Sequence, residues 1–296
     1  MTKPKVLVAD NMQKEVLDDL AGFAEVIFQP DDLHGAIQDV DFLVVRSATT
    51  VDKELLSKSK KLKAVIRAGV GMNNVDKEEC ARLGIKALNT PGASTNAVAE
   101  LAVLLMLGCS RKVHLADSSM KQKKWLKKEL LGKELSGKTL GVLGLGRIGT
   151  RVAELASIFG MKTIGHDPHV SEHKCVNCTS FEQVLADSDI ITLHMPSNKD
   201  TKGVINAENI AKMKDGAIII NTGRGDLIDH DALVDALKFG KIHAAGLDVH
   251  VVEPYDGVLT EMENVILTPH IAASTREAQL RLGEEVIGLI KKEHGA

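Results

Sequence analysis

Short apolar runs alternate with amphipathic stretches over the first ninety residues of the chain. The apolar runs predict β-strands at Lys5–Ala9, Ala24–Phe28, Phe42–Val45, Ala64–Ala68 and Ile85–Leu88. Segments with helical spacing lie between them, at Gln13–Leu20, Lys53–Lys58 and Lys77–Leu83. Because consecutive parallel strands are joined by helical crossovers, this alternation predicts right-handed β-α-β units and a parallel sheet.

A second strand–helix series follows a long segment that is apolar almost all round. This segment, residues 96–113, predicts a buried helix, and Ser94 or Thr95 can cap its start. The second series predicts strands at Thr139–Leu143, Thr163–His166, Ile190–His194, Ala217–Asn221, Ala244–Val249 and Val265–Thr268. From Ser274 the spacing predicts a final helix that ends near Lys292.

The composition fits this α/β pattern and narrows the function. Of the 296 residues, 44% are hydrophobic but only 3% are aromatic, so the core must be aliphatic, which suits sheets covered by helices. A net charge of −3 argues against a nucleic-acid binder and leaves a small molecule as the expected partner. Four cysteines are too few for a disulfide-rich secreted scaffold, and no apolar run could span a membrane. We therefore expect a cytoplasmic protein.

A glycine-rich turn, Gly144-Leu-Gly-Arg-Ile-Gly149, stands between a predicted strand and a predicted helix. Gly144 permits a tight turn, Gly146 lets the backbone approach a pyrophosphate, and Gly149 lets the helix pack closely on the sheet. The helix begins at Arg147 and Ile148, so its free N–H groups and positive dipole end face the phosphates. The turn predicts a dinucleotide site.

An acidic residue completes this pattern. Asp167 ends the next predicted strand, 18 residues beyond Gly149. That spacing is near the ~20 residues expected of the acid that binds the ribose hydroxyls. Because a carboxylate repels a 2′-phosphate, NAD is predicted rather than NADP.

Three polar side chains, Arg224, Glu253 and His270, each follow one of the last three predicted strands. Ligands of open α/β sheets bind beyond the carboxyl ends of strands, so these side chains are expected to converge. An imidazole is suited to remove the proton of a hydroxyl group while hydride leaves the carbon that carries that group. Glu253 would favour the imidazolium form of His270, and Arg224 would hold a carboxylate bidentately. Singly, each also fits a surface or structural residue, and only their combination favours catalysis.

These motifs resemble the D-isomer-specific 2-hydroxyacid dehydrogenase family over nearly the whole chain. The matching stretches are Gly144-Leu-Gly-Arg-Ile-Gly149, Asn221-Thr-Gly-Arg-Gly225, Leu247-Asp-Val249 with Glu253-Pro254, and Thr268-Pro-His-Ile271. Three further stretches are most similar to members that act on 3-phosphoglycerate: Val45-Arg-Ser-Ala-Thr49, Arg67-Ala-Gly-Val-Gly-Met-Asn-Asn-Val-Asp76 and Gly160-Met-Lys-Thr-Ile-Gly165. The resemblance implies NAD-dependent hydride transfer at C2 of 3-phosphoglycerate or a related 2-hydroxy acid.

The resemblance also assigns roles to individual residues. Cofactor contacts are implied for Gly144, Gly146, Arg147, Ile148, Gly149, Asp167, His194, Met195, Thr222, Gly223, Arg224, Asp248, His270 and Ala272. Substrate contacts are implied for Arg46, Ser47, Val70, Gly71, Asn96, Arg224 and His270. Backbone N–H groups near Val70 and Gly71 would hold the substrate carboxylate, and Arg46 and Ser47 would face its far end. Arg67, and Lys127 or Lys128 of the partner subunit, would add charge for a phosphate.

For the fold, the resemblance implies the α/β class, with two Rossmann-like or flavodoxin-like parallel-sheet domains and a cleft between them. Residues 1–93 plus 272–296 would form a discontinuous substrate-binding domain, and residues 94–271 an inserted NAD-binding Rossmann domain. The family is usually dimeric, so we expect a homodimer. The basic run Lys121–Lys128 is expected to form a solvated helix that buries Trp125, as in the family's dimer-forming arm.

The sequence departs from the family at two positions. His250 stands where an aromatic residue is frequent, and Arg46 is the only arginine in a loop where some members have two, which weakens the case for a phosphate. The chain also ends after its last predicted helix, so we expect no inhibition by serine through a C-terminal regulatory domain.

Other functions fit part of the pattern. A glyoxylate/hydroxypyruvate reductase or a D-lactate-type dehydrogenase shares the trio and differs only in what holds the substrate's tail. An NAD-sensing, corepressor-like binding protein would need only the glycine turn. Cys175 and Cys178, near His169 and His173, resemble part of a zinc motif, but structural zinc sites need a second ligand pair, so we expect no metal.

Overall fold

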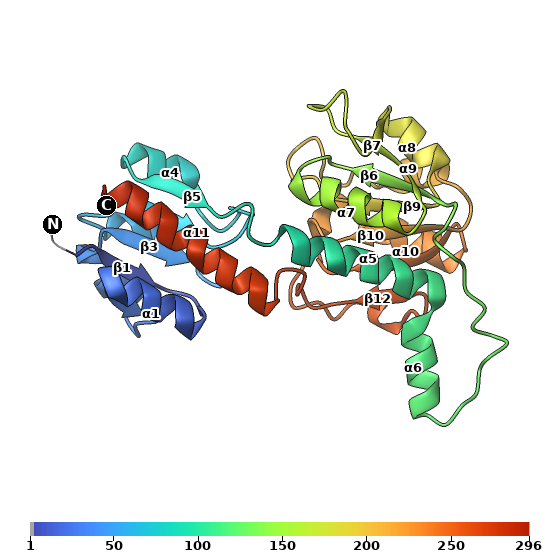
Figure 1. The fold of residues 1–296 in the computed structure, drawn as a ribbon, viewed down its shortest axis with the longest axis horizontal. Coiled ribbons are helices and arrows are strands. Elements are labelled where there is room, and N and C mark those ends of the chain that lie inside the picture. The colour runs from blue at the N-terminus through green and yellow to red at the C-terminus, as the bar shows by residue number, and fades with distance from the viewer. Residues whose placement is uncertain (1–2, 296) are drawn as a thin grey trace. The chain divides into compact units, whose positions relative to one another are not determined.

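A computed structural model describes residues 3–295, and the chain divides into two compact units. Unit 1 comprises Met1–Ser94 and Ser274–Ala296, and unit 2 comprises Thr95–Ala273 (Figure 1). The second unit is therefore inserted into the first. Among the described residues, no helix is both long and apolar enough to cross a membrane.

Unit 1 is a five-stranded parallel sheet flanked by helices. Its elements are β1 (Lys5–Val8), α1 (Lys14–Phe23), β2 (Glu25–Phe28), α2 (Leu33–Ala36), β3 (Phe42–Val45), α3 (Lys53–Ser57), β4 (Ala64–Arg67), α4 (Lys77–Arg82), β5 (Lys86–Asn89) and α11 (Arg276–His294). The strand order is β2-β1-β3-β4-β5. This is the flavodoxin-like order, in which the crevice that takes ligands lies where the order reverses, between β1 and β3.

Both faces of this sheet are buried, which explains why its strands read as continuous apolar runs. All four residues of β3 are buried. Leu20 of α1 packs on one face together with Val286 and Ile290 of α11. Burial of such a side chain stabilises the fold by about 1.5–3 kcal/mol. The last helix of the chain is thus fixed to the sheet formed by the first ninety residues.

Unit 2 is a seven-stranded parallel sheet. Its elements are α5 (Thr95–Arg111), α6 (Val113–Lys121), β6 (Thr139–Leu143), α7 (Arg147–Ile158), β7 (Lys162–His166), β8 (Asn177–Cys178), α8 (Phe181–Asp187), β9 (Ile190–Leu193), α9 (Ala207–Lys212), β10 (Ala217–Asn221), α10 (His230–Lys238), β11 (Ile242–Leu247) and β12 (Val265–Leu267). The order is β12-β11-β10-β9-β6-β7-β8, and it reverses between β6 and β9 as in the Rossmann fold. The expectation of two parallel-sheet α/β units is confirmed.

The helices of unit 2 cover both faces of its sheet. Helices α5 and α7 pack on one face, and α8, α9 and α10 pack on the other (Figure 1). The approach of α5 is close, because a Cβ at Gly246 of β11 would lie 2.9 Å from the Cβ of Leu105. A parallel sheet enclosed in this way presents only its strand ends to ligands, so the functional residues lie on the loops that follow the strands.

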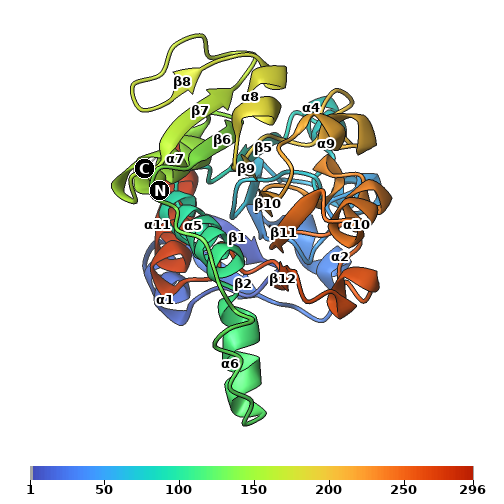
Figure 2. The ribbon, with the colours of Figure 1, turned by 90° about the vertical axis from the view of Figure 1, so that its right-hand side faces the viewer.

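The structure differs from the sequence prediction around residues 96–128. The single helix expected over residues 96–113 is interrupted at Lys112, whose φ of 51° is left-handed, and α6 then extends away from the sheet of unit 2 (Figure 2). The prediction of a helix over Lys121–Lys128 was wrong, since α6 ends at Lys121 and Lys123 is also left-handed. Trp125 is 76% exposed in the single chain rather than buried.

Candidate active site

The glycine turn connects β6 to α7 and is shaped by close backbone contacts. Gly144 has a φ of 94°, and a Cβ there would lie 2.7 Å from the carbonyl carbon of His194. A Cβ at Gly149 would lie 2.0 Å from the oxygen of Gly144, whereas no atom lies within 4 Å of the Cβ position of Gly146. Two glycines therefore let the turn pack tightly, and the third leaves open space in front of the helix N-terminus. This arrangement fits a pyrophosphate.

Asp167 follows β7 and lies against the glycine turn. Its Oδ2 accepts a hydrogen bond from the Leu145 backbone N–H at 2.9 Å, and its Oδ1 accepts one from the His169 N–H at 2.9 Å. A carboxylate oxygen has more than one acceptor site, so both oxygens can still receive hydroxyl donors. The residues present thus fit the ribose of NAD beside the pyrophosphate.

Two enclosed polar atoms lie at the ends of neighbouring strands. Among the described residues, the Nδ1 of His194, after β9, and the Oγ1 of Thr222, after β10, are buried without a hydrogen-bond partner. The other ring nitrogen of His194 contacts the Thr192 hydroxyl at 2.8 Å. Burial lowers the pKa of His194 to about 3, so its ring is neutral at physiological pH. Buried polar atoms without partners are costly, and a polar ligand at this edge would satisfy them.

Arg224 stands in a loop that Asn221 organises. The buried side chain of Asn221 donates to the Arg224 carbonyl at 2.8 Å and accepts from the Gly223 N–H at 3.0 Å. The Arg224 guanidinium donates to the Gly223 carbonyl at 2.6 Å, which leaves further N–H groups for a ligand. Sequence reasoning gave Asn221 no role of its own. The available signal was an amide as the last residue of an otherwise apolar strand.

Glu253 and His270, paired in the sequence interpretation, are joined by a hydrogen bond. The Nδ1 of His270 lies 2.8 Å from the Oε2 of Glu253, and both side chains remain partly exposed. Burial acts to raise the pKa of Glu253, but the hydrogen bonds from His270 and from the His250 backbone outweigh it and hold the pKa below its usual value. Because a carboxylate accepts the Nδ1 proton, the Nε2 of His270 is the nitrogen free to exchange a proton with a ligand.

His270 has a φ of 54°, a left-handed conformation that costs a non-glycine residue about 1–3 kcal/mol. Its N–H donates to the carbonyls of Asp248 at 2.9 Å and Thr268 at 3.0 Å. The fully buried Asp248 carboxylate accepts from the Thr268 hydroxyl at 2.6 Å and from the N–H groups of Ile271 at 2.8 Å and Ala272 at 2.9 Å. Asp248 therefore braces the His270 loop, a role that sequence reasoning missed.

Strand register brings the three catalytic candidates to one edge of the sheet. Asn221 pairs with Leu247, and Leu247 pairs with Leu267, so the loops that carry the trio begin side by side. The strands are parallel to β6, so these loops and the glycine turn lie at the same edge. Among the described residues, a hydrogen bond joins Glu253 to His270, while the hydrogen bond of the Arg224 guanidinium goes to the Gly223 carbonyl of its own loop.

The remaining predicted substrate residues are divided between the units. In unit 1, Asn74 links two of the predicted segments, because it follows Val70-Gly71 in sequence and its Nδ2 donates to the Arg46 carbonyl at 2.7 Å. Ser47 is exposed in the loop that begins at Arg46. Asn96 lies in unit 2, where its Oδ1 accepts from the Arg151 side chain at 3.0 Å.

The candidate zinc motif has other contacts. The Nε2 of His173 lies 3.0 Å from the Thr150 hydroxyl, and its Nδ1 accepts from the Cys175 N–H at 3.2 Å. Within residues 3–295, no three His, Cys, Asp or Glu side chains gather closely enough to hold a metal ion.

Comparison with known proteins gives concordant matches. The model of the NAD binding domain of D-isomer specific 2-hydroxyacid dehydrogenases matches residues 103–272. A hydroxypyruvate reductase of Thermotoga maritima is 47% identical, with 100% of both chains covered. A D-3-phosphoglycerate dehydrogenase of Archaeoglobus fulgidus is 41% identical over 97% of this chain, which spans 57% of that protein's length. The structure of a D-lactate dehydrogenase from Aquifex aeolicus with NAD and lactic acid superposes with a TM-score of 0.84 at 30% identity, covering 97% of this chain and 94% of that chain.

The matched residues include the glycine turn, Asp167 and the loops that carry Arg224, Glu253 and His270. The expected cofactor, NAD, is confirmed by these matches. The chain therefore belongs to the D-isomer specific 2-hydroxyacid dehydrogenase family of NAD-dependent oxidoreductases.

Proposed function

We propose that the protein interconverts 3-phosphoglycerate and phosphohydroxypyruvate, the entry reaction of serine synthesis, by hydride transfer at C2. The observation that carries the chemistry is the 2.8 Å pair between Glu253 and His270 at the same sheet edge as the dinucleotide turn. Bound NAD supplies the hydride acceptor. Gly144, Gly146 and Gly149 with Asp167 would hold it, and the orphaned polar atoms of His194 and Thr222 would be satisfied beside it.

In this proposal His270 is the general acid and base. In the oxidation, its Nε2 takes the hydroxyl proton while the C2 hydrogen leaves as hydride, and in the reduction it returns that proton to the carbonyl oxygen. Glu253 holds the ring through Nδ1 and stabilises the imidazolium that forms. The attraction between the Glu253 carboxylate and the His270 ring is strongest when the ring is protonated.

Arg224 is proposed to anchor the substrate carboxylate and polarise the neighbouring carbonyl. Its guanidinium has free N–H groups after the bond to Gly223, and a planar guanidinium matches a carboxylate bidentately. Asn221 keeps the Arg224 backbone in place from within the sheet. Asp248, proposed from the sequence to contact the nicotinamide, would do so while bracing the His270 loop.

The preference for a phosphate rests on unit 1. The loop from Arg46 to Thr49 is fixed by hydrogen bonds that it donates to the Asp10 carboxylate and by others that it accepts from the Asn74 side chain. It presents the Arg46 guanidinium, which donates to the Asn11 carbonyl at 3.2 Å. A fixed cation is what separates a phosphate from a hydroxymethyl tail. We propose that Arg46 and Ser47 bind the substrate's phosphate, and that Val70 and Gly71 offer backbone N–H groups to its carboxylate.

Reduction of hydroxypyruvate itself is the second candidate. A relative of equal length and 47% identity is a hydroxypyruvate reductase, and Arg46 is a single cation where a phosphate is often held by more. The two candidates share the catalytic trio and differ in the contribution of Arg46.

Specificity constants with NADH would separate the two substrates. We expect a kcat/KM at least about tenfold higher for phosphohydroxypyruvate than for hydroxypyruvate, since a charge-assisted pair contributes about 1.5–3 kcal/mol. Arg46→Gln should remove most of this preference while leaving the constant for hydroxypyruvate within about twofold, and Lys61→Gln, an exposed cation in the same unit, is the matched control. Equal constants for both substrates in the unmodified protein would transfer the proposal to hydroxypyruvate.

We also propose that two copies associate through residues 113–131, which comprise α6 and the loop after it. Met120, Trp125 and Leu131 are each more than half exposed in the single chain, and large exposed apolar side chains are typical of an interface. Sedimentation of the purified protein tests this, and a monomer at micromolar concentration would contradict it.

A further inference from the structure

We propose that His250 is a positioning residue that fastens the three loops carrying Arg224, Glu253 and His270 to one another. Its backbone and ring contact all three loops, although no proton transfer is assigned to it. The proposal deepens the proposed function and rests on it, because positioning matters only if the trio acts together.

The first contact is with Glu253. The His250 N–H donates to the Oε1 of Glu253 at 3.1 Å, while the Oε2 of the same carboxylate accepts from His270 at 2.8 Å. Each carboxylate oxygen thus has its own donor, and the carboxylate plane is fixed on both sides. A carboxylate held by one oxygen alone could rotate away from the imidazole.

The second contact is with the loop that carries His270. The Nε2 of His250 lies 3.1 Å from the carbonyl oxygen of Thr268, and that oxygen also accepts from the His270 N–H at 3.0 Å. A carbonyl oxygen only accepts, so the Nε2 of His250 carries the proton and donates. The ring therefore reaches the backbone that sets the position of the catalytic histidine.

The third contact is with the loop that carries Arg224. A Cβ at Gly225 would lie 2.1 Å from the carbonyl carbon of His250 and 2.6 Å from the Val251 nitrogen. The backbone next to Arg224 is therefore packed directly on the backbone of His250. A displacement of residue 250 would be transmitted to the arginine loop without any intervening side chain.

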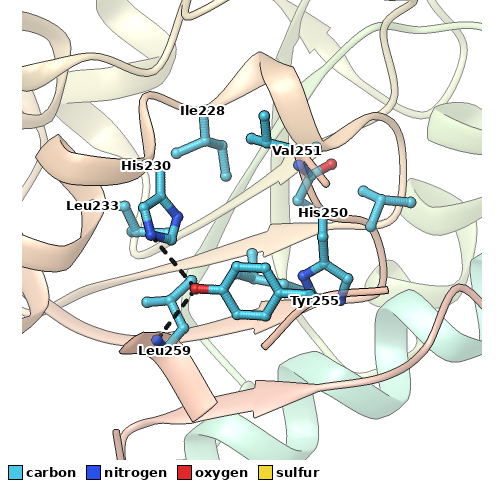
Figure 3. A pocket seen from close by; sticks show the side chains of 11 residues that line it. Ile228, His230, Leu233, His250, Val251, Tyr255 and Leu259 are labelled. Atoms are coloured by element: carbon cyan, nitrogen blue, oxygen red, sulfur yellow. Dashed lines mark hydrogen bonds between the residues drawn. The ribbon is translucent and has the colours of Figure 1, made fainter. Parts of the chain in front are cut away.

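The ring of His250 is also held by aromatic packing. It stacks on Tyr255 with 4.9 Å between ring centroids and 17° between the planes. The Tyr255 hydroxyl accepts from the Leu259 N–H at 3.3 Å and lies 3.4 Å from the Nε2 of His230 (Figure 3). In Figure 3 the phenol lies between the two imidazoles, and the three side chains line a small cavity together with Ile228, Leu233 and Leu259.

Two substitutions separate the ring's hydrogen bond from its packing. Phenylalanine at position 250 would keep the stack on Tyr255 but could not donate to the Thr268 carbonyl. Glutamine would lose the stack but place an N–H₂ donor near the position of Nε2. If the proposal is right, the hydrogen bond and not the ring area decides the catalytic effect.

The test compares H250F and H250Q with the unmodified protein, using whichever 2-oxo acid that protein reduces fastest with NADH. We expect H250F to lower kcat about tenfold with KM for the 2-oxo acid and NADH affinity within twofold, and H250Q to recover kcat to within about threefold. H114F is the matched control, because the His114 Nε2 also contacts a backbone carbonyl, that of Glu263 at 2.8 Å, at the opposite end of β12. H114F should keep full kcat.

Unchanged kcat in H250F would overturn the proposal. A loss in H250Q equal to or larger than that in H250F would overturn it too, because H250Q keeps a donor for the Thr268 carbonyl and loses only the stack. Hydrogen exchange of the backbone over residues 268–272 gives a readout without turnover. We expect H250F to accelerate exchange at Ile271 and Ala272, and unchanged exchange would also overturn the proposal. If the unmodified protein reduces no 2-oxo acid, the proposed function fails, and the exchange measurement still decides the role of His250.

Discussion

Each unit of the molecule uses a buried aspartate to hold a loop beyond its sheet, and the two differ in what the loop presents. In unit 1, Asp10 after β1 accepts from the Arg46 N–H, from the Thr49 N–H at 3.2 Å and from the Thr49 hydroxyl at 2.6 Å. In unit 2, Asp248 after β11 accepts from one hydroxyl and two backbone N–H groups of the loop around His270. One loop presents a cation and the other an acid–base pair.

The comparison teaches that the same structural device serves binding in one unit and chemistry in the other. An arginine needs to be near its ligand, but its long side chain tolerates small movements of the loop. A proton-transferring imidazole does not, because catalysis depends on hydrogen-bond distances and directions. Substitutions that displace the loop held by Asp10 in unit 1 should therefore change mainly KM. Substitutions that displace the loop held by Asp248 in unit 2 should change mainly kcat.

Removing the imidazole gives the largest expected effect. His270→Ala should lower kcat about 10³-fold in both directions, since a general acid–base contributes about 10²–10⁴-fold. NADH affinity, measured by fluorescence titration, should stay within about twofold, because the glycine turn and Asp167 are untouched. His34→Ala, an exposed histidine of unit 1, is the control and should keep full activity. Retention of more than a tenth of kcat in His270→Ala would remove the proposed acid–base role.

Replacing each buried aspartate with asparagine tests the comparison itself. Each carboxylate oxygen of Asp248 accepts from a backbone N–H group. In Asp248→Asn the amide nitrogen replaces one of these oxygens, and because it is itself a donor it cannot accept that hydrogen bond. We expect a loss of about 1–3 kcal/mol in the free energy of unfolding and about a tenfold lower kcat. In Asp10→Asn, the amide nitrogen can face the Thr49 hydroxyl, which can rotate to accept, so the loss should be smaller.

Urea unfolding and steady-state kinetics of the two variants provide the measurement. Asp10→Asn should raise KM for the 2-oxo acid more than it lowers kcat, and Asp248→Asn should do the reverse. The inferred difference between the two loops would be wrong if both variants lost the same free energy of unfolding and changed KM and kcat in the same proportion.

The pH dependence gives the smallest effect. The pKa of Glu253 is lowered in the folded protein, so its pairing with His270 adds stability at neutral pH that is lost as the pH falls through that lowered pKa. Because both side chains are partly exposed, the contribution should be only about 0.2–1 kcal/mol. Glu253→Gln should remove this acid limb from the melting temperature measured against pH. An acid limb of equal size in Glu253→Gln would assign it to another carboxylate.

Much of the fold could be predicted from the sequence because it depends on local patterns. The bounds of β3 and β10 were predicted to the residue, since a strand buried on both faces consists almost entirely of apolar residues. The two-residue strand β8 and the left-handed break at Lys112 were not predicted. Neither carries a periodic signal, and a lysine at positive φ depends on the surroundings of α5 and α6 rather than on local preference.

The candidate site divides in the same way. The glycine turn, Asp167 and the trio could be named from motif spacing, because their neighbours along the chain define the chemistry. Asn221, Asp248 and His250 could be named as positions but not given their structural roles. Their partners belong to other loops or to the backbone. Because every residue has a backbone carbonyl, the sequence does not indicate which carbonyl accepts a given hydrogen bond.

By itself, the sequence determined that this chain forms two parallel α/β sheets and carries a dinucleotide turn, because hydrophobic periodicity and glycine placement act over a few residues. Only the tertiary structure decided which side chains meet. Residues 250 and 268 are 18 positions apart, and they come together because β11 and β12 pair in one particular register. A shift of that register would leave every motif intact and separate the groups that the proposed chemistry needs.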